Sequence, residues 1–120
     1  MLTNNADVNI KDRHGDTPLH IAVERNDETF VKLLLKNNAD VNIRDWHGDA
    51  PLHVCARREF INISKLLIQS ECDINLPNFI GKTPLDLAIR ESNETLMKLL
   101  LEKNARGSMY QKGYAPAEHL

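Results

Sequence analysis

The sequence predicts an all-α solenoid, in which short helix-turn-helix pairs stack side by side along one axis. Two motifs recur at a fixed step of 33 residues. The first motif starts at Gly15, Gly48 and Gly81 and reads GDTPLHIAVE, GDAPLHVCAR and GKTPLDLAIR. The second reads NNADVN twice and then SECDIN, at the same step. Repeats of this length are typical of proteins in which each unit is too small to bury its own apolar face and packs on its neighbours.

The first helix of each unit is predicted to begin at the TPL segment. Thr17 is a good N-cap, and Pro18 takes the first helical position, where a missing N–H costs nothing. Leu19 and Ala22 then form an apolar stripe on a short helix. Asn26 tolerates the left-handed conformation and is expected to end that helix.

A second helix is predicted over residues 28–36, which read ETFVKLLLK. We expect Phe30, Leu33 and Leu34 to share its buried face. Asn38 is predicted to end this helix as a left-handed terminator, and the chain is then extended and turns before the next unit. The three KLL runs, at 32–35, 65–68 and 98–101, are too short for a membrane span or a coiled coil and are predicted to form the core between repeats.

These units resemble the ankyrin repeat, whose signature T-P-L-H-x-A stands here at residues 17–22. In the second copy Ala50 replaces the threonine, and in the third copy Asp86 replaces the histidine. The resemblance covers roughly residues 1–106. It implies helix pairs joined by β-hairpin-like loops in one domain, 1–120. This domain is divided into a partial N-terminal repeat 1–11, repeats 12–44, 45–77 and 78–106, and a degenerate or partial C-terminal repeat 107–120.

The chain departs from the family at two sites in each repeat where glycine is usual. Asn26, Glu59 and Ser92 occupy the site between the two helices, and Asn38, Glu71 and Asn104 occupy the site after the second helix. We expect left-handed backbone at these positions, at a cost on the order of 1 kcal/mol each and less for asparagine. The middle repeat has glutamate at both sites and lacks the capping threonine, so it is predicted to be the least stable locally.

Composition limits the classes of function. Charged residues make up 27% of the chain and its net charge is −2, which argues against a general nucleic-acid binder. The two cysteines, Cys55 and Cys72, follow no disulfide or metal spacing. No apolar run is long enough to span a bilayer, and no signal-peptide pattern follows Met1. We therefore predict an intracellular protein, cytoplasmic or nuclear, that does not act at a membrane.

Catalysis is not indicated by any group of residues in the sequence. His20 and His53 recur at one repeat position, but the resemblance implies that this histidine bonds to backbone and ties neighbouring loops together. Cys55 and Cys72 replace small packing residues. No nucleophile–base pair or glycine-rich phosphate loop appears. The sequence thus predicts neither an enzyme nor a site for a cofactor, a metal or a small-molecule substrate.

In the ankyrin fold, the hairpin tips and the exposed side of each first helix form a concave surface. Twelve positions of this surface are predicted to contact a partner protein: Arg13, His14, Arg25, Arg44, Trp46, His47, Arg57, Arg58, Phe79, Ile80, Lys82 and Arg90. Six more map onto the same surface, namely Lys11, Asp16, Glu24, Asp49, Pro77 and Glu91. Basic residues outnumber acidic ones on it, which favours an acidic protein segment with apolar anchors as the partner.

Trp46 is the only tryptophan of the chain and falls at a predicted hairpin tip, one repeat before Phe79. Adjacent exposed apolar residues usually mark an interface, and tryptophan is enriched among interface hot spots. The alternative is that Trp46 folds over a neighbouring hairpin and only shields its backbone. Two other functions stay open: contact with nucleic acid through the same arginines, and a passive structural segment of a longer ankyrin array.

The resemblance also implies a modification. Ankyrin repeats are substrates of an iron- and 2-oxoglutarate-dependent asparaginyl hydroxylase that favours a leucine, five residues, an acidic residue, Val or Ile, and then Asn. Asn42 and Asn75 fit that spacing and are candidates for hydroxylation. Asparagines in hairpins also bridge backbone groups of the turn, and this structural role alone accounts for their recurrence.

Overall fold

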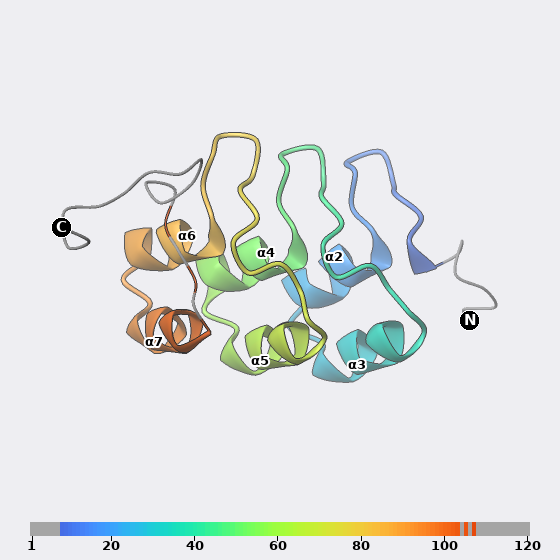
Figure 1. Cartoon of the computed structure of the whole chain (residues 1–120). Helices are drawn as coiled ribbons and strands as arrows, with labels where there is room; N and C mark the ends of the chain where they lie inside the picture. The colour runs from blue at the N-terminus through green and yellow to red at the C-terminus, as the bar shows by residue number, and fades with distance from the viewer. Residues whose placement is uncertain (1–7, 104, 106, 108–120) are drawn as a thin grey trace, which may run out of the picture.

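The structure is a computed structural model that describes residues 8–103, 105 and 107. Six helices have both ends in this part: α2 (Pro18–Glu24), α3 (Glu28–Lys36), α4 (Pro51–Arg58), α5 (Ile61–Gln69), α6 (Pro84–Arg90) and α7 (Glu94–Glu102). Helices α2, α4 and α6 form one layer and α3, α5 and α7 form a second (Figure 1). Each helix contacts its partner in the pair and its counterpart in the next pair, and the described part of the chain holds no strand. The predicted all-α solenoid is therefore confirmed.

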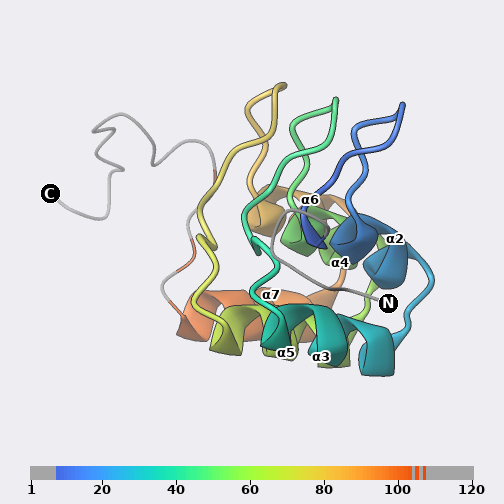
Figure 2. The same cartoon turned by 90° about the vertical axis from the view of Figure 1, so that its right-hand side faces the viewer.

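Three loops project away from the first layer and stand side by side (Figure 2). We call residues 9–16 the first hairpin, 42–49 the second and 75–82 the third. Two backbone hydrogen bonds close each tip. In the first hairpin, the amide of Asp12 donates to Asp16 O and the amide of Gly15 donates to Asp12 O, and the equivalent residues of the second and third hairpins form the same two bonds. These bonds stay within single turns, so the loops follow the path of a hairpin without forming a β-ladder in the described residues.

The first helices begin where the TPL motif predicts. Thr17 and Thr83 accept hydrogen bonds from the backbone amides three residues later, and proline follows each of them. Ala50 stands at the same N-cap position before α4 and has no side chain that can accept one. An alanine N-cap typically costs about 1 kcal/mol, so α4 begins with a weaker cap than α2 and α6.

Left-handed backbone occurs where the glycine replacements predict it. Asn26 and Asn38 have φ of 54° and 67°, Glu59 and Glu71 both have 61°, and Ser92 has 56°. Each residue follows a helix and lets the chain reverse direction there. Asn104 lies outside the described residues.

The core lies between the two helix layers and between successive repeats. Leu19, Ala22, Val31 and Leu34 are buried in the first repeat. Their counterparts in the next two repeats are also buried, except Met97 of the third, which is half-buried. The prediction for Leu33 is wrong, because its side chain is 49% exposed. Leu33 lies one helical step of about 100° from Leu34, so it turns away from the narrow stripe that α3 buries.

Leu101 of the third KLL run is exposed in the same way. The three KLL runs therefore contribute only part of their leucines to the core. Of the predicted partial repeats, residues 1–7 and 108–120 lie outside the described residues, so the structure has no bearing on those two segments.

Candidate functional site

Two buried histidines join neighbouring repeats. His20 Nδ1 accepts a hydrogen bond from the backbone amide of Thr17 at 3.2 Å, and His53 Nδ1 accepts one from the amide of Ala50 at 3.0 Å. The proton therefore sits on Nε2, which donates to the carbonyl oxygen of Asp49 at 2.8 Å in the case of His20. The Nε2 of His53 donates to Lys82 O at 3.0 Å, and burial lowers the pKa of His53 below 6.5. Each imidazole thus bonds to its own helix start and to the next hairpin, which confirms the predicted structural role.

The cysteines are unsuited to nucleophilic chemistry. Burial raises the pKa of Cys55 to about 12 and that of Cys72 to about 11, so both are neutral thiols at physiological pH. Within the described residues, no group of three or more His, Cys, Asp or Glu side chains is placed to hold a metal ion. No helix in this part of the chain is long and apolar enough to cross a membrane.

Trp46 covers the first hairpin and is still exposed. Its indole N–H donates to Arg13 O at 2.9 Å, and a Cβ added to Gly15 would lie 2.6 Å from Trp46 Cδ2. The ammonium group of Lys11 lies 4.9 Å from the ring centroid. Even so, 58% of Trp46 is exposed. Trp46 therefore does shield the first hairpin, as the alternative to an interface role predicts, but most of its side chain stays in solvent.

Phe79 repeats this arrangement one hairpin further on. A Cβ added to Gly48 would lie 2.6 Å from Phe79 Cδ1, and the guanidinium carbon of Arg44 lies 5.6 Å from the phenyl centroid. Arg44 also donates to Pro77 O at 2.9 Å and is half-buried between the hairpins. Phe79 is 64% exposed, and its neighbour Ile80 is 71% exposed. Both residues thus lie in solvent at the tip of the third hairpin.

An open hollow of 480 Å³ lies between the second and third hairpins and α4. Its apolar lining is Trp46, Phe79 and Ile80, and its polar lining is His47, Asp49, Arg57 and Asn78. This volume falls in the range of ordinary ligand sites. The predicted residues Trp46, His47, Arg57, Phe79 and Ile80 are therefore brought together around one concavity.

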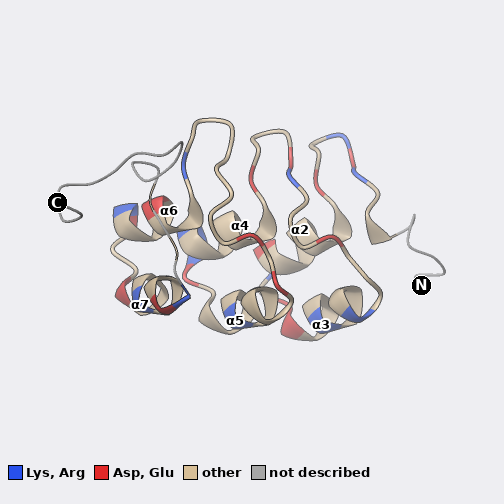
Figure 3. Cartoon of the chain, in the orientation of Figure 1, with Lys and Arg blue, Asp and Glu red and all other residues tan. Residues whose placement is uncertain are grey.

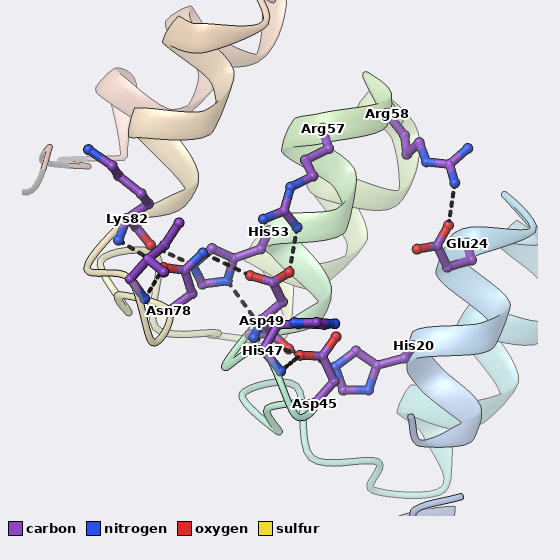
Figure 4. A network of polar contacts seen from close by, with 12 residues as sticks. His20, Glu24, Asp45, His47, Asp49, His53, Arg57, Arg58, Asn78 and Lys82 are labelled. Atoms are coloured by element: carbon purple, nitrogen blue, oxygen red, sulfur yellow. Dashed lines mark hydrogen bonds and ion pairs between the residues drawn. The ribbon is translucent and has the colours of Figure 1, made fainter. Parts of the chain in front are cut away.

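The polar wall of the hollow is a hydrogen-bonded network centred on Asp49 (Figure 4). Its Oδ1 accepts from Asn78 Nδ2 at 3.0 Å, and its Oδ2 forms an ion pair with Arg57 Nη1. The side chain of Asp49 is only 6% exposed, whereas that of Arg57 is 39% exposed. Asp49 was mapped to the exposed surface from sequence, and this placement is wrong because the third hairpin packs over it. Arg58 pairs with Glu24 of the preceding repeat at 2.9 Å.

Sequence reasoning missed the contributions of Asp45 and Asn78 to this site. Asp45 Oδ1 accepts the amides of His47 and Asp49, and Asn78 Oδ1 accepts those of Ile80 and Lys82. Each carboxylate or amide therefore fixes the shape of its own hairpin tip. The signal was available, because aspartate or asparagine at the start of a short turn is typical of this bonding pattern.

The other predicted contact residues lie apart from the hollow. Arg13 and His14 are on the first hairpin, Arg25 follows α2, Lys82 ends the third hairpin and Arg90 ends α6. All five are exposed, and among the described residues none of them forms an ion pair. Figure 3 shows basic residues on the hairpins, at the ends of α4 and α6, and also on α3, α5 and α7.

The candidate asparagines lie at the bases of the hairpins. Asn42 Oδ1 accepts the amide of Asp73 at 2.7 Å, and Asn9 Oδ1 accepts that of Asp40 at 2.8 Å. The backbone amide of Asn75 donates to Asp73 Oδ1 at 3.0 Å. The side chain of Asn42 therefore joins its loop to the loop of the next repeat, whereas we expected it to bridge backbone groups within its own turn.

Comparison with known proteins identifies the repeat. A family model described as ankyrin repeats, in three copies, matches residues 1–78 and 45–111. No curated protein matches the chain. The matched ranges include all three hairpins and every residue that lines the hollow.

Proposed function

Because the chain belongs to the ankyrin-repeat family, whose repeats are generally protein–protein interaction modules, we propose that it is a non-catalytic module that binds a partner protein. The partner contacts the hairpin tips and the concave side of α2, α4 and α6. The observation that carries this proposal is the exposure of Trp46, Phe79 and Ile80 on two adjacent tips. Clustered apolar side chains of this size are characteristic of interaction surfaces.

The partner that fits this surface best is an acidic segment with apolar anchors. Lys11 and Arg44 lie against the exposed aromatic rings, so a carboxylate beside an apolar anchor would meet a cation on either hairpin. Arg13, Arg25 and Arg90 supply further charges with no ion pair among the described residues. Charge complementarity of this kind chiefly raises the association rate and selects among partners.

The test compares capture of partner proteins by the intact chain and by the double variant Trp46→Ala, Phe79→Ala. The matched control is Leu33→Ala, which removes an apolar side chain of similar exposure from the outer face of α3. Truncation of Trp46 alone should weaken a captured partner by about 2 kcal/mol, or roughly 30-fold. The control should bind as the intact chain does.

Two outcomes contradict the proposal. Equal loss in the double variant and in Leu33→Ala would place the interface elsewhere. Capture that consists of nucleic acid, and that weakens steeply with salt regardless of sequence, would support the arginine-based alternative. Circular dichroism of each variant ensures that binding is compared per folded molecule.

A further inference from the structure

The hollow between the second and third hairpins combines an apolar half and a charged half. Trp46, Phe79 and Ile80 offer the exposed apolar surface, while Arg57 of α4 supplies a partly exposed guanidinium. These residues come from two hairpins and a helix that the repeat fold holds in register. A ligand in this hollow would therefore meet both chemistries at once.

Arg57 is held in place before any ligand arrives. The buried carboxylate of Asp49 accepts from its Nη1, and Asn78 fixes that carboxylate from the other side. A guanidinium has five N–H donors, and 39% of the Arg57 side chain still faces solvent. Because its rotamer is already restricted, Arg57 loses little conformational freedom when a second carboxylate binds.

Among the three hairpin–helix junctions that the structure describes, this arrangement exists at one. At the first junction, the residues equivalent to Asp49, Arg57 and Asn78 are Asp16, Glu24 and Asp45, which are all acidic. Glu24 stands where Arg57 does, so this junction has no guanidinium at that position to bind a carboxylate. At the third junction, Lys82 replaces Asp49 and Arg90 replaces Arg57, so no buried acid holds the arginine there.

We propose that this hollow is a recognition site for one short segment of the partner, in which a large apolar side chain lies within about three residues of an aspartate or glutamate. The apolar side chain packs between Trp46, Phe79 and Ile80, and the carboxylate binds the outer N–H groups of Arg57. The inference rests on the proposed function and narrows it to one pocket and one ligand chemistry. Affinity therefore depends on Arg57 far more than on Arg90, which forms no ion pair within the described part of the chain.

The experiment selects peptides from a random display library on the full chain. A selected peptide, labelled with fluorescein, is then titrated by anisotropy with the intact chain, with Arg57→Gln and with the matched control Arg90→Gln. Both substitutions remove one exposed positive charge from the same repeat position. A second peptide carries the amide in place of the acidic residue.

We expect the selected peptides to pair a large apolar residue with Asp or Glu. Arg57→Gln should weaken binding by about tenfold or more, and Arg90→Gln by less than about threefold. The amide peptide should lose about tenfold on the intact chain and little further on Arg57→Gln, because both changes remove the same contact. Should Arg57→Gln fail to fold, the amide peptide tests the contact on the unaltered protein.

Equal and additive losses for the two arginine variants would overturn the inference, since they indicate general charge attraction. The proposed function would survive that result, provided that Trp46→Ala and Phe79→Ala still reduce binding. Failure to enrich any peptide also overturns the inference, because a short segment would then be insufficient. Selected peptides whose binding is unaffected by all hairpin and concave substitutions would contradict the proposed function itself.

Discussion

Replacing Glu59 with glycine should stabilise the protein. Glu59 follows α4 with φ of 61° and ψ of 34°, in the left-handed region. Its side chain is exposed, and among the described residues it forms no hydrogen bond or ion pair. The substitution therefore removes backbone strain and sacrifices no contact of the side chain.

The expected gain follows from two opposing terms. A residue with a Cβ in the left-handed conformation costs about 1–2 kcal/mol, and glycine would relieve this cost. Glycine also has more freedom in the unfolded chain, which returns about 0.5–1 kcal/mol. The net stabilisation should be roughly 0.5–1 kcal/mol. With an m-value of about 2 kcal/mol per molar urea, the midpoint should rise by about 0.25–0.5 M.

Glu91→Gly is the matched control. Glu91 follows α6 as Glu59 follows α4, and it is exposed, but its backbone is right-handed, with φ of −87° and ψ of 2°. Glycine relieves no strain there, so its greater freedom in the unfolded chain should lower the midpoint. Urea denaturation followed by circular dichroism at the helix band measures both variants. A fall for Glu59→Gly, or equal shifts for the two, would refute the reasoning.

Three further predictions follow from the same contacts. Gly15→Ala should lower the free energy of unfolding by about 1–3 kcal/mol more than Gly81→Ala does. The new Cβ at residue 15 would lie 2.6 Å from Trp46 Cδ2, whereas nothing lies within 4 Å at residue 81, and φ is positive at both. Equal urea midpoints for the two variants would contradict this prediction. Because burial lowers the pKa of His53, the unfolded chain binds the proton more readily, so the free energy of unfolding should fall as the pH drops below 6.5. If a His53→Gln variant loses stability between pH 7.5 and 5.5 as steeply as the intact chain does, His53 is not the cause. Incubation with an iron- and 2-oxoglutarate-dependent asparaginyl hydroxylase should add about 16 Da at Asn42 or Asn75, measured by peptide mass spectrometry. If neither residue gains mass while a control ankyrin substrate is modified, the hydroxylation hypothesis is wrong and only the structural role stands.

The architecture could be predicted because short-range chemistry specifies each element. A capping threonine before proline begins α2 and α6, and left-handed backbone follows all three first helices at Asn26, Glu59 and Ser92. Repetition of these signals every 33 residues then determines the stacking. The error at Leu33 arose where an apolar side chain lies beside the buried stripe, because composition alone cannot give the angular width of that stripe.

The sequence allowed us to predict which positions line the site, but not the hydrogen bonds and ion pairs that connect their side chains. Trp46 and Phe79 were identifiable from their place in the repeat. The burial of Asp49 depends on the third hairpin, whose Asn78 lies 29 residues away in sequence. Whether Arg57 pairs with Asp49 or extends into solvent depends on the rotamer of its side chain in the folded chain, and no sequence pattern specifies that rotamer.

The central claim is that a partner binds the concave side and the hairpin tips. Hydrogen–deuterium exchange of the full chain, with and without a captured partner, measures this most directly. The account predicts that binding slows exchange in the second and third hairpins and in α4, and leaves α3, α5 and α7 unchanged. Slowed exchange confined to α3, α5 and α7 would place the partner on the outer face and contradict the account.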